Sequence, residues 1–137
     1  MLSQQQQHQI THYLQQQIPS LLAVYLFGSQ ALGDATESSD IDLAVYHSED
    51  LDTLTLWHLS SELANLLGKD VDLVDFNQAS TVFQNQILLA EQRLWCKDHD
   101  LVDSYEASII TMKLHLDASR AEILQSIRET GQVYSQG

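Results

Sequence analysis

The residues with the clearest chemical meaning are a Gly-Ser pair and, after a ten-residue spacer, two aspartates with one residue between them. Gly28 and Ser29 follow the apolar run 21–27, and Asp40 and Asp42 open a second apolar run. A strand directs alternate side chains to one face, so the two aspartates point the same way. Carboxylates held together repel unless a cation lies between them, and Mg²⁺ prefers carboxylate oxygens while keeping positions free for phosphate. Glycine permits close backbone approach and serine offers a hydroxyl and an N–H, so the motif predicts a metal–triphosphate site.

A third carboxylate is expected to join this pair. The segment 69–76 alternates polar and apolar residues, as a strand with one polar face does. If this strand lies beside the strand of the first two aspartates, Asp72 can join them, and three carboxylates can hold two metal ions. Asp70 shares a face with Asp72 but lies nearer the start of the strand, whereas Asp75 falls on the opposite face. Asp72 is therefore the predicted third ligand, with Asp70 as second choice.

A plainer interpretation is that Asp40 caps a turn while Asp42 and Asp72 are solvated strand residues. Both strands otherwise have the composition of buried strands, where an unpaired carboxylate is costly. A cation shared by the three carboxylates is the better interpretation.

Helices and strands are expected to alternate around these motifs. The apolar spacing predicts helices over 3–17, 51–67 and from 80 or 81 to about 91, and strands over 21–27, 41–46, 71–76 and 93–96. A short helix at 30–32 would direct its N-terminal amides at phosphate. Gly68 is suited to end the helix predicted over 51–67. This order predicts a single α/β (α+β) domain with a small mixed β-sheet flanked by helices.

The C-terminal part of the chain predicts one long helix. From Leu101 onward, an apolar stripe steps by three or four residues from Tyr105 to Ile127, with the polar Ser119 filling the one gap, between Leu116 and Ile123. A helix of about 30 residues is about 45 Å long, which exceeds what so small a domain can cover. We therefore expect 98–137 to form a helical extension of the domain 1–97, packing partly on it and partly on another protein.

Composition narrows the class of protein and its partners. The 137 residues carry a net charge of −13 and are 44% hydrophobic, so the chain can bury a core. An acidic surface repels phosphate, which argues against direct nucleic-acid binding and suits a basic protein partner. The single cysteine, Cys96, allows no internal disulfide, and no signal segment or apolar run of about 18 residues is apparent. A cytoplasmic protein that does not bind membranes is expected.

Taken together, the Gly-Ser pair, the Asp-x-Asp and the later strand carboxylate resemble the nucleotidyltransferase superfamily that includes DNA polymerase beta. The short length and the segment LFGSQALGDATESSDIDLAVY are similar to its minimal nucleotidyltransferases, the MntA-type antitoxins of HepT–MntA (HEPN–MNT) toxin–antitoxin modules. Members commonly carry an arginine shortly after the Gly-Ser, where this chain has Leu32. Since no lysine or arginine precedes Lys69, the triphosphate charge must be met mainly by metal, backbone N–H groups, the tail or a partner.

The resemblance implies a nucleotidyltransferase fold and an activity. Such a protein transfers AMP from ATP to a tyrosine hydroxyl of a cognate HEPN ribonuclease toxin and thereby silences it. In this chain Asp40, Asp42 and Asp72 would bind two Mg²⁺ ions and carry the catalysis, while Gly28 and Ser29 would bind the phosphates of ATP.

Two alternatives remain open. The acceptor could be a small hydroxylated molecule such as an aminoglycoside, although only about 40 residues follow the motif-bearing region, fewer than a drug-binding domain needs. The chain could also be a catalytically silent antitoxin that neutralises its toxin by binding alone. Against this, a relic site has no reason to keep three like charges facing one another.

Overall fold

The computed structural model describes residues 2–28 and 40–130, with side chains described to residue 125. Ser29 and the short helix expected at 30–32 lie outside the described residues. The elements are, in order, α1 (Gln4–Gln17), β1 (Leu21–Phe27), β2 (Ile41–His47), α3 (Thr53–Leu67), β3 (Val71–Asp75), the 3-10 helix η1 (Phe76–Gln78), α4 (Thr81–Leu89), β4 (Arg93–Cys96) and α5 (His99–Thr130). Every helix and strand expected in the described residues is present.

The helix ends follow from local side-chain chemistry. The side chain of Ser3 accepts a hydrogen bond from the Gln6 N–H, and the Gln6 side chain accepts one from the Ser3 N–H, which closes a capping box at α1. Asp52 and Ser80 accept from free N–H groups at the starts of α3 and α4. Gly68 ends α3 in the left-handed conformation, with φ of 68°, as its position in the sequence predicts.

The four strands form one mixed sheet in the order β3-β2-β1-β4. β1 pairs antiparallel with both β2 and β4, whereas β2 and β3 run parallel because α3 carries the chain back between them. The small mixed sheet expected from the sequence is therefore confirmed. Its parallel pair brings the starts of β2 and β3, where the aspartates lie, to the same edge.

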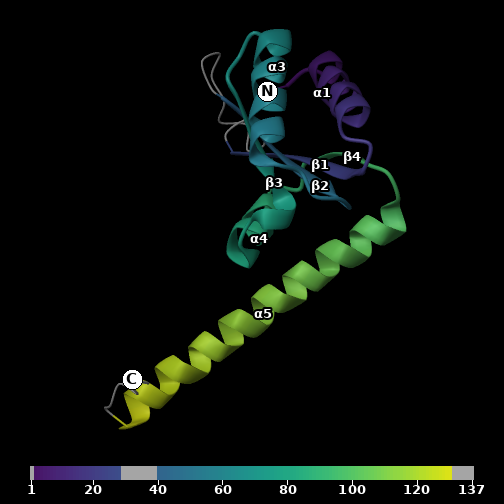
Figure 1. Cartoon of the computed structure of the whole chain (residues 1–137). Coiled ribbons are helices and arrows are strands. Elements are labelled where there is room, and N and C mark those ends of the chain that lie inside the picture. The colour runs from purple at the N-terminus through teal and green to yellow at the C-terminus, as the bar shows by residue number, and fades with distance from the viewer. Residues whose placement is uncertain (1, 29–39, 131–137) are drawn as a thin grey trace.

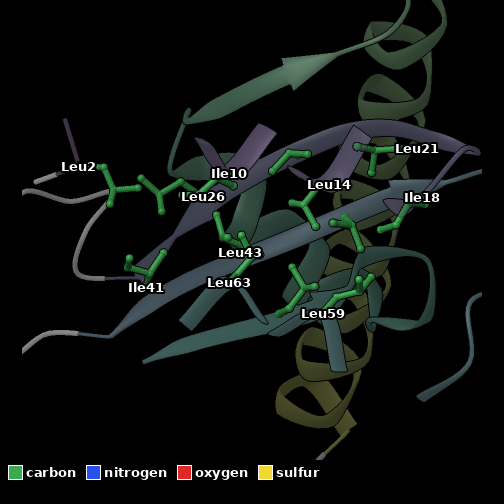
Figure 2. Close-up of a cluster of buried hydrophobic side chains, with 13 residues drawn as sticks. Leu2, Ile10, Leu14, Ile18, Leu21, Leu26, Ile41, Leu43, Leu59 and Leu63 are labelled. Atoms are coloured by element: carbon green, nitrogen blue, oxygen red, sulfur yellow. The ribbon is translucent and has the colours of Figure 1, made fainter. Parts of the chain in front are cut away.

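Helices cover both faces of this sheet (Figure 1). On one face, α1 and α3 pack against the sheet through a cluster of leucines and isoleucines that includes Ile10, Leu14, Leu43 and Leu63, each wholly buried (Figure 2). On the other face, α4 and the first turns of α5 cover a second cluster, made of Ala23, Tyr25, Ala44, Phe76, Ile87, Val102 and Ile109. Two separate cores thus fix the sheet from both sides.

The long helix α5 contacts the domain over about its first half, where Met112 accepts a hydrogen bond from Thr81 of α4, and then extends beyond it (Figure 1). Val102 and Ile109 are buried, but further along Leu114 and Ile123 are 64% and 60% exposed. This agrees with the expectation that the helix is longer than the domain can cover. No helix in the described part of the chain combines the length and apolar character needed to cross a membrane.

A partly buried polar network holds the start of α5 on the sheet. The Arg93 guanidinium of β4 lies 2.8 Å from a carboxylate oxygen of Glu106 and 2.8 Å from one of Asp103, both on α5. The Tyr25 hydroxyl of β1 donates to Glu106 over 2.8 Å. Burial, and then the Glu106 carboxylate, raise the pKa of Tyr25 above its ordinary value, so the hydroxyl remains a donor.

Removing this donor gives a modest, testable loss of stability. Tyr25→Phe keeps the packing but leaves Glu106 without one of its donors, so we expect the free energy of unfolding to fall by about 1–2 kcal/mol. Urea unfolding followed by circular dichroism measures it. Tyr13→Phe, at a less buried tyrosine on α1, is the control and should cost less than half as much; equal losses would contradict the assignment.

Candidate active site

The parallel pair β2–β3 brings two of the predicted acids together. Asp42 of β2 lies opposite Asp72 of β3 in the register of the ladder. Because side chains alternate along a strand, both point to the face that carries Ala44 and Tyr46, the face packed by α4 and α5. Asp72 is exposed, whereas Asp42 is partly buried. The choice of Asp72 as neighbour of the first aspartate pair therefore agrees with the strand register.

Asp40 stands immediately before β2 and is exposed. The next residue, Ile41, donates its N–H to the carbonyl of Asp70 over 2.9 Å, which ties the starts of the two strands together. Burial raises the pKa of the Asp42 carboxyl above its ordinary value, and the charges of Asp72 and then Asp40 raise it further. The charges of Asp72 and Asp40 thus both act on the Asp42 carboxylate.

Gly28 is the backbone neighbour of this acidic group. It has φ of 72°, a conformation that glycine adopts freely and side-chain-bearing residues rarely do. A Cβ at this position would lie 3.1 Å from Cγ of Asp42 and would overlap its Oδ2. Glycine is therefore required both by the backbone and by the space that the Asp42 carboxylate takes. Ser29, the predicted partner of Gly28, lies outside the described residues.

The donor set suits a hard divalent cation, although it does not form a closed cage. Within residues 2–28 and 40–130, no three His, Cys, Asp or Glu side chains are grouped so that they could hold a metal ion. Asp42 and Asp72 nevertheless present oxygen donors side by side, and their repulsion raises the Asp42 pKa. A cation bound there would relieve that repulsion, and carboxylate oxygens are the ligands that Mg²⁺ prefers. Ligation by Asp40, Asp42 and Asp72 stays a prediction.

The repulsion has a consequence for stability and pH. A carboxyl whose pKa is higher in the folded than in the unfolded chain destabilises the fold once ionised; this penalty is complete above the raised pKa and disappears below 3.8, the ordinary value. We expect Asp42→Asn in EDTA to melt about 2 °C higher than the wild type at pH 7. The difference should shrink as the pH falls toward 4. Melting curves between pH 4 and 7 measure it; a lower melting temperature for the variant at pH 7 would refute the repulsion.

A polar hollow of about 620 Å³ lies at the end of β2 opposite Asp42. It is lined by His47, Asp75, Asn77 and the acidic turn after the strand. His47 is buried and lies 2.8 Å through Nε2 from Asp75, while its Nδ1 contacts the carbonyl of Glu49. Asp75 also accepts from the Asn77 N–H over 3.0 Å and so caps η1. These polar groups are engaged with one another, and Asp75 falls away from the other acids, as its position in the strand predicts.

The sequence did not predict one part of the site, an apolar hollow. A mainly apolar hollow of about 390 Å³ borders Gly28, with Phe27 of β1 and Phe83 of α4 among its lining residues. The two rings meet edge to face with centroids 5.5 Å apart. Phe27 is the register partner of Asp42 and lies on the same face of the sheet. An aromatic residue directly before the Gly-Ser pair was the available signal, but nothing in the sequence pairs it with Phe83.

Comparisons with known proteins agree with this geometry. Residues 8–100 match the family described as polymerase beta, nucleotidyltransferase. The protein adenylyltransferase MntA of Shewanella oneidensis is 36% identical to this chain over 126 residues, which make up 92% of this chain and 90% of that protein. The similarity therefore extends past the sheet and its aspartates into α5.

Solved structures give the same result. A chain in the crystal structure of a toxin–antitoxin with AMP-PNP superposes with a TM-score of 0.75 at 37% identity, covering 89% of this chain and 98% of that one. A chain in the structure of tri-AMPylated Shewanella oneidensis HEPN toxin in complex with MNT antitoxin gives a TM-score of 0.72 at 35% identity, covering 93% and 99%. The nucleotidyltransferase fold expected from the Gly-Ser and Asp-x-Asp motifs is confirmed.

Proposed function

The chain belongs to the polymerase beta nucleotidyltransferase family, and from that premise we propose that it is an antitoxin with protein adenylyltransferase activity. It transfers AMP from ATP to a tyrosine hydroxyl of a cognate HEPN ribonuclease toxin and so neutralises the toxin. The observation that carries this proposal is the similarity to MntA over 92% of the chain, a span that includes both the acidic site and α5. A family member acting on another substrate need not retain both.

The reaction is a displacement at the α-phosphorus of ATP. The tyrosine oxygen forms a bond to that phosphorus, and the bond from phosphorus to the α–β bridging oxygen breaks. Pyrophosphate leaves with the electron pair, and the hydroxyl proton passes to the Asp72 carboxylate, which is exposed and beside Asp42. Such chemistry depends mainly on positioning and on neutralising charge, so a few carboxylates and a backbone cradle are sufficient protein machinery.

Asp40, Asp42 and Asp72 are the proposed magnesium ligands, and Gly28 with Ser29 is the proposed phosphate-binding turn. Bound Mg²⁺ would neutralise the triphosphate and lower the pKa of the acceptor hydroxyl. The chain itself holds Asp42 and Asp72 side by side at the starts of two neighbouring strands. The glycine at position 28 leaves room for the Asp42 carboxylate, which a Cβ there would overlap. The part-burial of Asp42 strengthens its interaction with any cation, because fewer water molecules screen it.

The charge of ATP has few protein cations to meet it. Leu32 stands where relatives commonly have arginine, Arg93 is engaged by Asp103 and Glu106, and Lys113 is paired with Asp117. The proposed sources of positive charge are therefore magnesium, backbone N–H groups and the partner. We accordingly expect ATP to bind weakly to the isolated chain and more tightly to its complex with the toxin.

The proposal is tested by incubating the purified chain and its HEPN toxin with Mg-ATP and measuring intact masses. Stepwise additions of AMP to the toxin are the expected result, together with loss of its ribonuclease activity. An unmodified toxin that is still inhibited would instead favour neutralisation by binding alone. AMP addition to an aminoglycoside, with none to the toxin, would favour the small-molecule transferase.

A further inference from the structure

The apolar hollow beside Gly28 adjoins the acidic site. Phe27 lies opposite Asp42 in the β1–β2 ladder, and Gly28, which lines the hollow, is in van der Waals range of the Asp42 carboxylate. The remaining wall comes from α4, including the ring of Phe83. A group seated in this hollow would therefore have one end at the proposed reacting phosphate and its body between aromatic and aliphatic side chains.

The lining chemistry favours a phenol ring over a nucleobase. Among the described residues that line the hollow, none is charged and Gln86 supplies the sole polar side chain. A purine presents several hydrogen-bonding groups on its edge, and burying them without partners is costly. A tyrosine ring is apolar except for its hydroxyl, and it would pack well against the edge-to-face pair of Phe27 and Phe83.

The hollow continues into a surface that a small molecule would not need. Leu89, the last residue of α4, is 72% exposed and lines both the hollow and a groove of about 330 Å³ between α4 and α5. On the α5 side of this groove, Ile110 and Leu114 are 45% and 64% exposed. Contiguous exposed apolar side chains of this kind mark protein-binding surfaces.

The charge around the groove indicates what kind of segment it receives. Glu91 and Asp117 line it, and Lys113, its one cation among the described residues, is paired with Asp117. The chain as a whole carries a net charge of −13. The complementary ligand is a polypeptide segment with apolar side chains facing the groove and basic residues at its margin.

We propose that Phe27, Phe83, Leu89, Ile110 and Leu114 form an acceptor-docking surface, in which the α4–α5 groove seats a basic, partly apolar segment of the partner protein. The partner's acceptor tyrosine then inserts its ring into the hollow, with its hydroxyl toward Asp42. This inference rests on the proposed function and adds to it the surface that selects the acceptor.

The test uses two substitutions on this surface and one matched control. Leu89→Gln changes the edge shared by hollow and groove, and Leu114→Gln changes the groove alone. Leu54→Gln makes the same change at a leucine that is 79% exposed on α3, on the opposite side of the sheet. All three positions are exposed, so the variants should fold, which melting curves verify. Leu89→Met is included as a conservative variant that restores the apolar contact.

The measurements are the KM for the HEPN toxin in AMP transfer, the Kd of the toxin complex and the affinity for Mg-ATP. We expect Leu89→Gln and Leu114→Gln to raise the KM and Kd for the toxin about tenfold while the Mg-ATP affinity changes less than twofold. Leu54→Gln and Leu89→Met should behave as the wild type does.

Each other result overturns a specific claim. Weaker Mg-ATP binding in Leu89→Gln, with Leu114→Gln unaffected, would make the hollow a nucleobase site instead. Wild-type KM and Kd in both groove variants would overturn the docking surface while leaving the proposed transferase intact. Toxin binding that depends on Leu89 and Leu114, without any AMP transfer by the wild type, would refute the proposed reaction and keep the docking surface. No toxin binding by the wild type would refute both.

Discussion

Asp42→Asn is expected to abolish AMP transfer while leaving the complex with the toxin assembled. The substitution keeps the size of the side chain and removes the charge on which Asp72 and Asp40 act. Loss of a proposed magnesium ligand should lower the rate by about 10³-fold or more, equivalent to about 4 kcal/mol of transition-state stabilisation. Intact mass of the toxin after incubation with Mg-ATP measures the rate, and gel filtration measures assembly.

This variant separates chemistry from folding because the two effects have opposite signs. Removing a repelled charge is expected to stabilise the metal-free chain slightly, so an inactive variant that melts at or above the wild-type temperature locates its defect at the site. Asp50→Asn, at an exposed aspartate beyond the far end of β2, is the matched control and should transfer AMP normally. Persistent transfer in Asp42→Asn would remove Asp42 from the catalytic machinery.

The sequence allowed the sheet and the place of the acids to be predicted because these depend on short-range patterns. The apolar run 21–27 is β1, and the alternation in 69–76 predicts the face on which Asp72 lies. Gly68 could be assigned as a helix end because helices commonly end at a residue in the left-handed conformation, which glycine adopts without strain. The pairing of Asp42 with Asp72 required one further assumption, that β2 and β3 are neighbours, and a helix between two strands makes that the usual arrangement.

The contacts between distant segments could not be predicted in this way. Arg93, Glu106 and Tyr25 come from β4, α5 and β1, and no spacing rule brings three such residues together. The pairing of Phe27 with Phe83 depends equally on how α4 lies over the sheet. The stripe on α5 is ambiguous in the sequence, because buried Ile109 and exposed Ile123 follow the same spacing. Where α5 stops packing on the domain depends on how far the domain extends, which the spacing along the helix does not show.

Gly28→Ala is expected to reduce AMP transfer by about 10²-fold or more and to destabilise the fold. The new methyl group would overlap Oδ2 of Asp42 and lie 3.1 Å from its Cγ, so the carboxylate must move. A displacement of about 1 Å at a reacting group is sufficient for a loss of this size. The left-handed conformation, with φ of 72°, adds about 1–2 kcal/mol of strain for alanine.

Gly68→Ala separates these two causes. Gly68 has nearly the same conformation, with φ of 68°, but a Cβ there meets nothing within 4 Å. Its alanine variant should therefore lose about 1–2 kcal/mol of stability from strain alone and keep its transfer activity at temperatures where it is folded. Urea unfolding and AMP transfer to the toxin are measured for both variants at the same temperature. If both lose activity equally, strain rather than the displaced Asp42 carboxylate is the cause, because the overlap with Asp42 is the main difference between the two sites.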